Sequence, residues 1–96
     1  MYIFSKTTLL KTMYEMNDLI AMVPLIDTIK HYLNRHLDIK LPYKDSIFMF
    51  LNYLNTLSTV KKKNGRGALR LKDRLKDSKQ FFQKRWITGK AEEFLS

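Results

Sequence analysis

The 96-residue chain contains no cysteine. This absence excludes a disulfide, a thiolate metal site and a cysteine nucleophile, and it fits a reducing compartment. Only three glycines are present, and none lies in the pattern of a phosphate-binding loop. The first residues lack the basic, apolar and small-residue regions that together make a secretory signal. We therefore expect a cytoplasmic protein.

Long hydrophobic runs are also missing. The longest apolar windows are Leu19–Ile26 and Ile47–Leu51, whereas a helix that spans a bilayer needs roughly 20 apolar residues. We therefore expect no transmembrane segment. Hydrophobic residues nevertheless make up 45% of the chain, which is enough for one modest core. A chain of this length is predicted to form a single domain over residues 1–96.

Two helices are predicted in the first part of the chain. Apolar side chains recur at alternating intervals of four and three residues, the spacing of one helix face: Leu9, Met13, Met16, Ile20 and Val23. Pro24 lacks a backbone donor, so it should end this helix or open the next one. We predict helices over 7–22 and 24–37 that meet at a bend; one kinked helix is the alternative.

A third helix is predicted after a short connector. Residues 38–44 include Pro42 and show no periodicity, which is typical of a connecting segment. The apolar face of residues 46–60 is broad, so this helix should be central and largely buried. Residues 1–60 are thus expected to supply a hydrophobic helical core.

The segment after Val60 has two interpretations. Residues 61–67 combine a lysine run with two glycines, the composition of a flexible basic loop. Asn64-Gly65 can form the tip of a hairpin over 60–72, or Gly65 can cap the third helix in the left-handed conformation. We favour the cap because apolar positions continue at helical spacing: Ala68, Leu71, Leu75, Ser78, Phe82 and Trp86. This interpretation predicts a basic amphipathic helix over 68–88 and a tail over 89–96.

Together these elements predict an all-α protein, a small bundle of three to four helices with a basic C-terminal helix. A winged-helix-like arrangement with the hairpin at 60–72 is the minor alternative. A recognition helix needs basic side chains that face the DNA groove, and residues 46–60 contain no lysine or arginine. Contact with nucleic acid would therefore come from residues 61–85.

Positive charge is concentrated toward the C-terminal end. Residues 1–60 carry six Lys/Arg against five Asp/Glu, whereas residues 61–96 carry twelve against four. One explanation is a solvated helix whose long cations lie along the edge of the core. The excess is larger than pairing along a helix requires, and we favour an anionic partner. The residues predicted to contact phosphates are Lys61, Lys62, Lys63, Arg66, Arg70, Arg74 and Lys76.

Aromatic residues are interleaved with these cations. Single-stranded nucleic acid is bound by stacking together with phosphate neutralisation, and interfacial membrane helices combine the same residue types. Phe81, Trp86 and Tyr43 are therefore candidates for stacking or for an interface. In the alternative, Phe82 and Trp86 dock on the core, and only Phe81 is left exposed on the polar side.

Catalysis is not expected. His31 and His36 are five residues apart, which turns them about 140° from each other on a helix, and the carboxylates are scattered. We expect no cofactor and no metal. The sequence predicts a small non-enzymatic accessory or regulatory protein that binds nucleic acid without sequence specificity. The alternative is a helical inhibitor, immunity or adaptor protein that binds an acidic partner protein. A homo-oligomer is compatible with either function.

Overall fold

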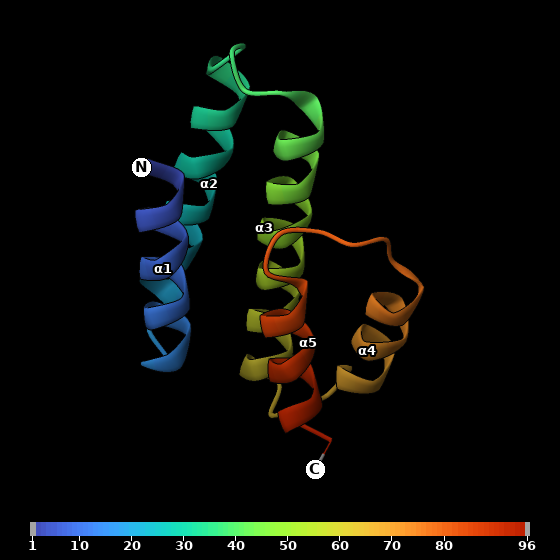
Figure 1. Ribbon diagram of the computed structural model, residues 1–96. Helices are drawn as coiled ribbons and strands as arrows, with labels where there is room; N and C mark the ends of the chain where they lie inside the picture. Colours follow the sequence, from blue (N-terminus) through green and yellow to red (C-terminus); the bar gives the residue numbers. More distant parts are fainter. Residues whose placement is uncertain (1, 96) are drawn as a thin grey trace. The chain divides into compact units, whose positions relative to one another are not determined.

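The computed structural model describes residues 2–95. Within them, five helices follow one another along the chain (Figure 1): α1 Tyr2–Glu15, α2 Leu19–Arg35, α3 Leu41–Lys62, α4 Ala68–Asp77 and α5 Lys84–Glu93. The described range contains no strand, which confirms the all-α class, although five helices replace the expected three to four. The helices form two compact units, divided between Lys40 and Leu41. Such units can belong to one domain, so the single domain remains a prediction.

The first unit is a pair of helices, α1 and α2, separated by a tight reversal at Asn17. This residue has φ 62°, a left-handed conformation that asparagine visits more readily than most residues. The N–H of Asp18 donates to the carbonyl of Met13 (2.8 Å), and the N–H of Asn17 donates to that of Tyr14 (3.1 Å). These two bonds form a Schellman motif, which ends α1.

The bend was predicted at Pro24, and this prediction is wrong. Pro24 lies inside α2, whose first residue is Leu19. The Schellman motif at Asn17 has already ended the preceding helix before the chain reaches the proline. Inside α2 the proline removes only one intrahelical hydrogen bond, the one to the carbonyl of Ile20. Helix α2 therefore continues through it.

The earlier boundary changes which side chains are buried in the first unit. The predicted stripe does not face one core, because Leu9, Met16 and Val23 are exposed and Ile20 is 86% exposed. The helical phase restarts at Leu19, so residues on the two sides of the reversal point in different directions. The buried apolar side chains of α1 and α2 are instead Ile3, Leu10, Tyr14, Leu19, Met22, Ile26, Ile29 and Leu33.

Helix α3 is the centre of the second unit, and α4 and α5 pack against it. It has the broad buried face expected of residues 46–60: Ile47, Phe50, Leu51, Leu54, Leu57 and Val60. The helix begins at Leu41, so the connector predicted over 38–44 is wrong from that residue onward. Pro42 lies in the first helical turn, where its missing N–H would have no intrahelical partner in any case.

The single basic helix predicted over 68–88 is wrong, because residues 78–83 interrupt it. Ser78 is extended (ψ 153°), and its hydroxyl donates to the carbonyl of Leu75 at 2.8 Å. The Nζ of Lys84 donates to the carbonyl of Ser78 at 2.7 Å, so a side chain from the start of α5 holds the end of α4. Helix α5 then continues to Glu93, which also replaces most of the tail predicted over 89–96.

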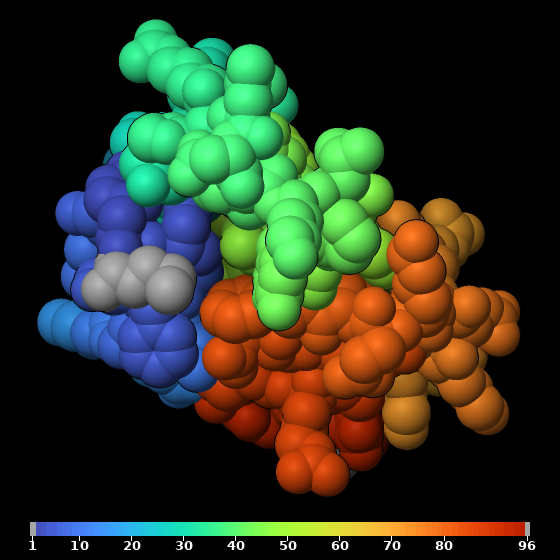
Figure 2. All heavy atoms as spheres, turned by 45° about the horizontal axis from the view of Figure 1, so that its top comes forward, coloured from blue at the N-terminus to red at the C-terminus, as the bar shows by residue number. Residues whose placement is uncertain are grey.

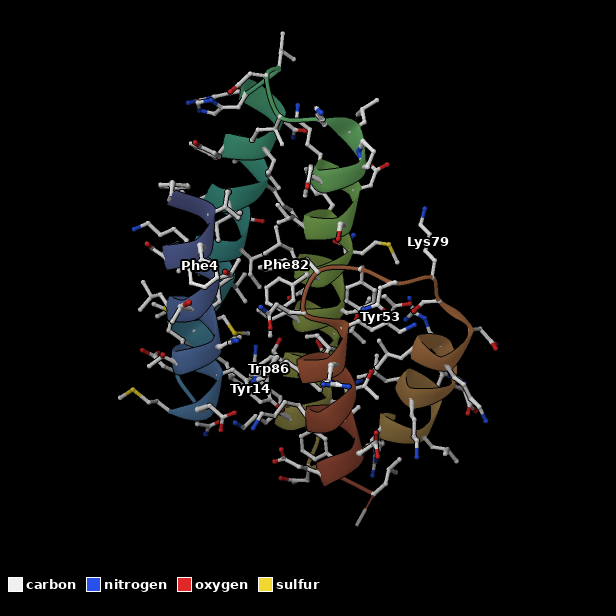
Figure 3. The ribbon with its side chains drawn as sticks, viewed as in Figure 1. Phe4, Tyr14, Tyr53, Lys79, Phe82 and Trp86 are labelled. Atoms are coloured by element: carbon white, nitrogen blue, oxygen red, sulfur yellow. The ribbon has the colours of Figure 1, made fainter. Side chains whose placement is uncertain are left out.

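The interruption brings two aromatic rings onto α3. Phe81 stacks on Tyr53 with ring centroids 5.1 Å apart and an interplanar angle of 9°. Phe82 meets Phe50 edge to face, with centroids 5.6 Å apart and an angle of 89°. In Figure 3, Phe82 and Tyr53 lie on either side of the segment that crosses α3. A continuous helix would place Phe81 and Phe82 on different faces, so the packing of both rings against α3 explains the break.

Candidate nucleic-acid interface

The lysine run stands at the C-terminal end of α3, where a second Schellman motif closes the helix. The N–H of Gly65 donates to the carbonyl of Val60 (2.9 Å), and the N–H of Asn64 donates to that of Lys61 (3.2 Å). The predicted helix cap is therefore present. The residue at the left-handed cap position is Asn64 (φ 57°) rather than Gly65, which follows it at φ 90°. With no strand in the described range, the hairpin over 60–72 is wrong.

The cap determines where the first four predicted contact residues lie. Helix α3 runs through Lys62, so Lys61 and Lys62 are helical rather than loop residues. Lys62, Lys63 and Arg66 are exposed, whereas Lys61 is half-buried. Their charges also complement the partial negative charge of the free carbonyls at the end of the helix.

Helix α4 carries its cations on two flanks. Arg70 and Arg74 are four residues apart on one flank, and Arg74 lines a groove together with residues of α3. Lys72 and Lys76 lie on the other flank and line a groove with residues of α5. The side chains of the α4 region stand out from the surface in Figure 2, where they are orange. The structure therefore separates Lys76 from the two arginines that were predicted to act with it.

Most of the predicted contact residues have no acidic partner. Within residues 2–95, five of them are exposed and form no ion pair with a carboxylate: Lys62, Lys63, Arg66, Arg70 and Lys76. Four of these five stand within nine residues of sequence around the turn between α3 and α4. Like charges gathered in this way repel one another, and a bound anion would relieve that repulsion.

Arg74 differs from these five because it lies against an aromatic ring. Its guanidinium carbon is 5.5 Å from the centroid of the Tyr53 ring. The groove beside this pair measures about 240 Å³ and is lined by Met49, Asn52, Tyr53, Thr56 and Arg74. Sequence reasoning missed Tyr53. Its spacing, three residues after Phe50 and four before Leu57, places it next to the buried face of α3 and could have indicated it.

The groove on the other flank of α4 is formed mainly by lysine. It measures about 250 Å³ and is lined by Lys72, Leu75, Lys76, Lys84 and Thr88. Lys84 is already engaged, because its Nζ holds the carbonyl of Ser78. Lys84 therefore has a structural role, which was not predicted from the sequence.

The three aromatic candidates do not form one surface. Phe81 was expected to be the exposed ring, and this expectation is wrong: it is only 4% exposed because it stacks on Tyr53. Trp86 is half-buried, and the Nζ of Lys90 lies 5.6 Å from its ring centroid. Tyr43 is 67% exposed in the first turn of α3. Only Tyr43 is therefore open to a partner without rearrangement.

Comparison with protein-family models, with curated proteins and with solved structures found no match to this chain. Within residues 2–95, no helix combines the length and apolar character that crossing a membrane requires. The same residues contain no cluster of three acidic or histidine side chains placed to hold a metal ion.

Proposed function

We propose that this protein is a small non-enzymatic accessory or regulatory protein that binds nucleic acid through its phosphates. The observation that carries the proposal is the group of exposed cations without acidic partners around the turn between α3 and α4. Lys62, Lys63 and Arg66 occupy the turn side of this group, and Arg70 continues it onto α4. Contacts of this kind position a nucleic acid without selecting its sequence. A cytoplasmic location is part of the proposal.

The alternative, an inhibitor, immunity or adaptor protein for an acidic partner protein, is supported by a different observation. Tyr43 and the neighbouring Leu41 are 67% and 70% exposed at the start of α3. An aromatic anchor of this type is typical of a protein interface. Burial of Phe81 removes one of the other anchors that this alternative would use, so we rank it second.

Salt dependence of binding tests the phosphate proposal. Each neutralised phosphate releases condensed counterions, so the logarithm of the affinity falls with the logarithm of salt by about 0.9 per contact on duplex DNA and about 0.7 on a single strand. The Lys62→Ala/Lys63→Ala protein should therefore lower the slope by about 2 units on a duplex. Fluorescence anisotropy with labelled DNA over a salt series measures this slope.

A charge-matched variant separates local contacts from net charge. Arg35 and Lys40 are also exposed, and changing both to Ala removes the same number of positive charges, two, from the first unit. The Arg35→Ala/Lys40→Ala protein should keep the wild-type slope. Equal slopes in all three proteins, or no binding by the wild type at low salt, would contradict the proposal. An acidic protein would then be the favoured partner.

A further inference from the structure

Two side chains cover the Tyr53 ring, and one of them is buried whereas the other is exposed. Phe81 lies nearly parallel to the ring at a centroid distance of 5.1 Å, and Phe81 itself is buried. The side of the Tyr53 ring that meets Phe81 is therefore part of the core. The guanidinium carbon of Arg74 lies over the ring as well, 5.5 Å from its centroid, and Tyr53 and Arg74 line a groove beside the pair. Arg74 is exposed, so the part of the ring that it covers lies under a solvated side chain.

The flat ring of a nucleobase can displace the Arg74 guanidinium from the Tyr53 ring. An exposed cation over an aromatic ring contributes a factor of about 2 to 5 to an equilibrium. Stacking of a nucleobase on an aromatic side chain contributes a factor of about 5 to 150. Exchange of the guanidinium for a base is therefore favourable. The displaced guanidinium stays beside the site and can pair with a phosphate, the geometry that arginine suits best.

The groove around Tyr53 has the composition of a site for one base. Asn52 and Tyr53 follow Met49 by three and four residues, and Thr56 follows them by four and three, so the four side chains share one face of α3. Arg74 closes the groove from α4. A thioether beside an aromatic ring provides the apolar surface. The Thr56 hydroxyl already donates to the carbonyl of Asn52 (3.1 Å), and its oxygen can still accept a hydrogen bond from the edge of a base. Figure 3 shows Tyr53 directed from α3 toward α4.

We propose that Tyr53 stacks on an unpaired nucleobase and that Arg74 moves from the ring to a neighbouring phosphate when the base binds. The proposal rests on the phosphate binding proposed above and adds a preference for single strands. Bases in a duplex are stacked on one another and offer no free face to a protein side chain. The group Lys62, Lys63, Arg66 and Arg70 would bind either form, whereas the Tyr53 site selects the unpaired one.

Two strands of equal charge test this selection. A labelled oligothymidylate and an abasic strand of the same length carry the same phosphates, but only the first carries bases. The Tyr53→Leu protein should bind oligothymidylate about 5- to 150-fold more weakly than the wild type, with the abasic strand unaffected. The Tyr53→Phe protein keeps an aromatic ring and should bind both strands like the wild type.

A second pair of variants avoids any disturbance of the ring stack. Thr56→Glu places a carboxylate in the groove, and Asn55→Glu places the same charge one residue away, on an exposed part of α3 outside it. We expect Thr56→Glu to weaken oligothymidylate binding at least fivefold more than Asn55→Glu does. The two variants should bind the abasic strand equally.

The outcomes separate the two proposals. Suppose that the wild type binds both strands. If Tyr53→Leu then lowers the affinity for both by the same factor, or lowers the affinity for neither, the base site is wrong while phosphate binding stands. Equal effects of Thr56→Glu and Asn55→Glu on oligothymidylate lead to the same conclusion. If the wild type binds neither strand at low salt, phosphate binding is wrong, and the base site is overturned with it.

Discussion

The two units of this protein place different chemistry at their surfaces. The unit that ends at Lys40 carries five Lys/Arg against four Asp/Glu, whereas the unit that begins at Leu41 carries thirteen against five. Exposed apolar residues show the opposite distribution among residues 2–95. The first unit has Phe4, Leu9, Met16, Ile20, Val23 and Leu37, and the second has Leu41, Tyr43, Leu69 and Leu95. Both units have buried apolar side chains, but only the second combines them with a large excess of positive charge.

The difference shows that the charge boundary and the structural boundary are not the same. Charge changes after Val60, but the structural division falls between Lys40 and Leu41. Helix α3 has no lysine or arginine between residues 46 and 60, yet it belongs to the basic unit and gives α4 and α5 their apolar support. The basic segment is therefore a folded part of a helical unit, and its cations depend on α3 for their positions.

The largest expected effect comes from removing that support. Leu75 is 1% exposed on α4, and Leu75→Ala should lower the free energy of unfolding by about 2–5 kcal/mol because it deletes a fully buried side chain. Leu69 lies on the same helix and is 63% exposed, so Leu69→Ala should change it by no more than about 0.5 kcal/mol. Urea denaturation measures both. Equal effects would mean that α4 is not anchored to the core of its unit.

Smaller effects of opposite sign are expected at two glycines, Gly65 in the turn that joins α3 to α4 and Gly89 inside α5. Gly65 has φ 90°, and an added Cβ would lie 3.3 Å from Cδ1 of Phe94. Gly65→Ala should therefore cost about 1–2 kcal/mol. Gly89 lies inside α5 with no atom within 4 Å of an added Cβ, so Gly89→Ala should stabilise the protein by about 0.5–1 kcal/mol. Thermal melting would show one midpoint falling and the other rising.

The smallest effect is expected on the exposed apolar surface of the first unit. Ile20 is 86% exposed, and Ile20→Ala should change the free energy of unfolding by no more than about 0.5 kcal/mol. Ile29 is fully buried on the same helix, so Ile29→Ala should cost about 2–5 kcal/mol. Urea denaturation distinguishes the two. A large loss with Ile20→Ala would instead support the stripe that the sequence predicted across residues 9–23.

Local sequence signals were sufficient for the helical class and for α3. The periodic apolar residues of 46–60 identify a helix with a broad buried face because each position depends only on its neighbours three and four residues away. The helix ends were harder to predict. Asn17 ended α1 through backbone hydrogen bonds that apolar periodicity does not report, and the more conspicuous Pro24 proved compatible with the interior of α2.

Some features of the candidate site could likewise be predicted from the sequence, and others could not. Exposure of Lys62, Lys63 and Arg66 could be predicted because lysine and arginine side chains are rarely buried. Burial of Phe81 could not, because it depends on Tyr53, which lies 28 residues earlier in the chain. The contact between Arg74 and the same ring likewise requires knowing how α4 packs on α3. Contacts between distant segments override the preferences that a local pattern records.

The Schellman motif at Asn64 has a consequence for the chemical ageing of the protein. An Asn-Gly sequence deamidates when the glycine nitrogen attacks the asparagine side-chain carbonyl, which closes a succinimide ring and releases ammonia. In the folded chain the N–H of Gly65 donates to the carbonyl of Val60 at 2.9 Å, so the attack requires this bond to open first. Hydrolysis of the ring leaves a carboxylate next to the lysine run. Deamidation at Asn64 therefore records how often the end of α3 unwinds, and each event lowers the positive charge at that end.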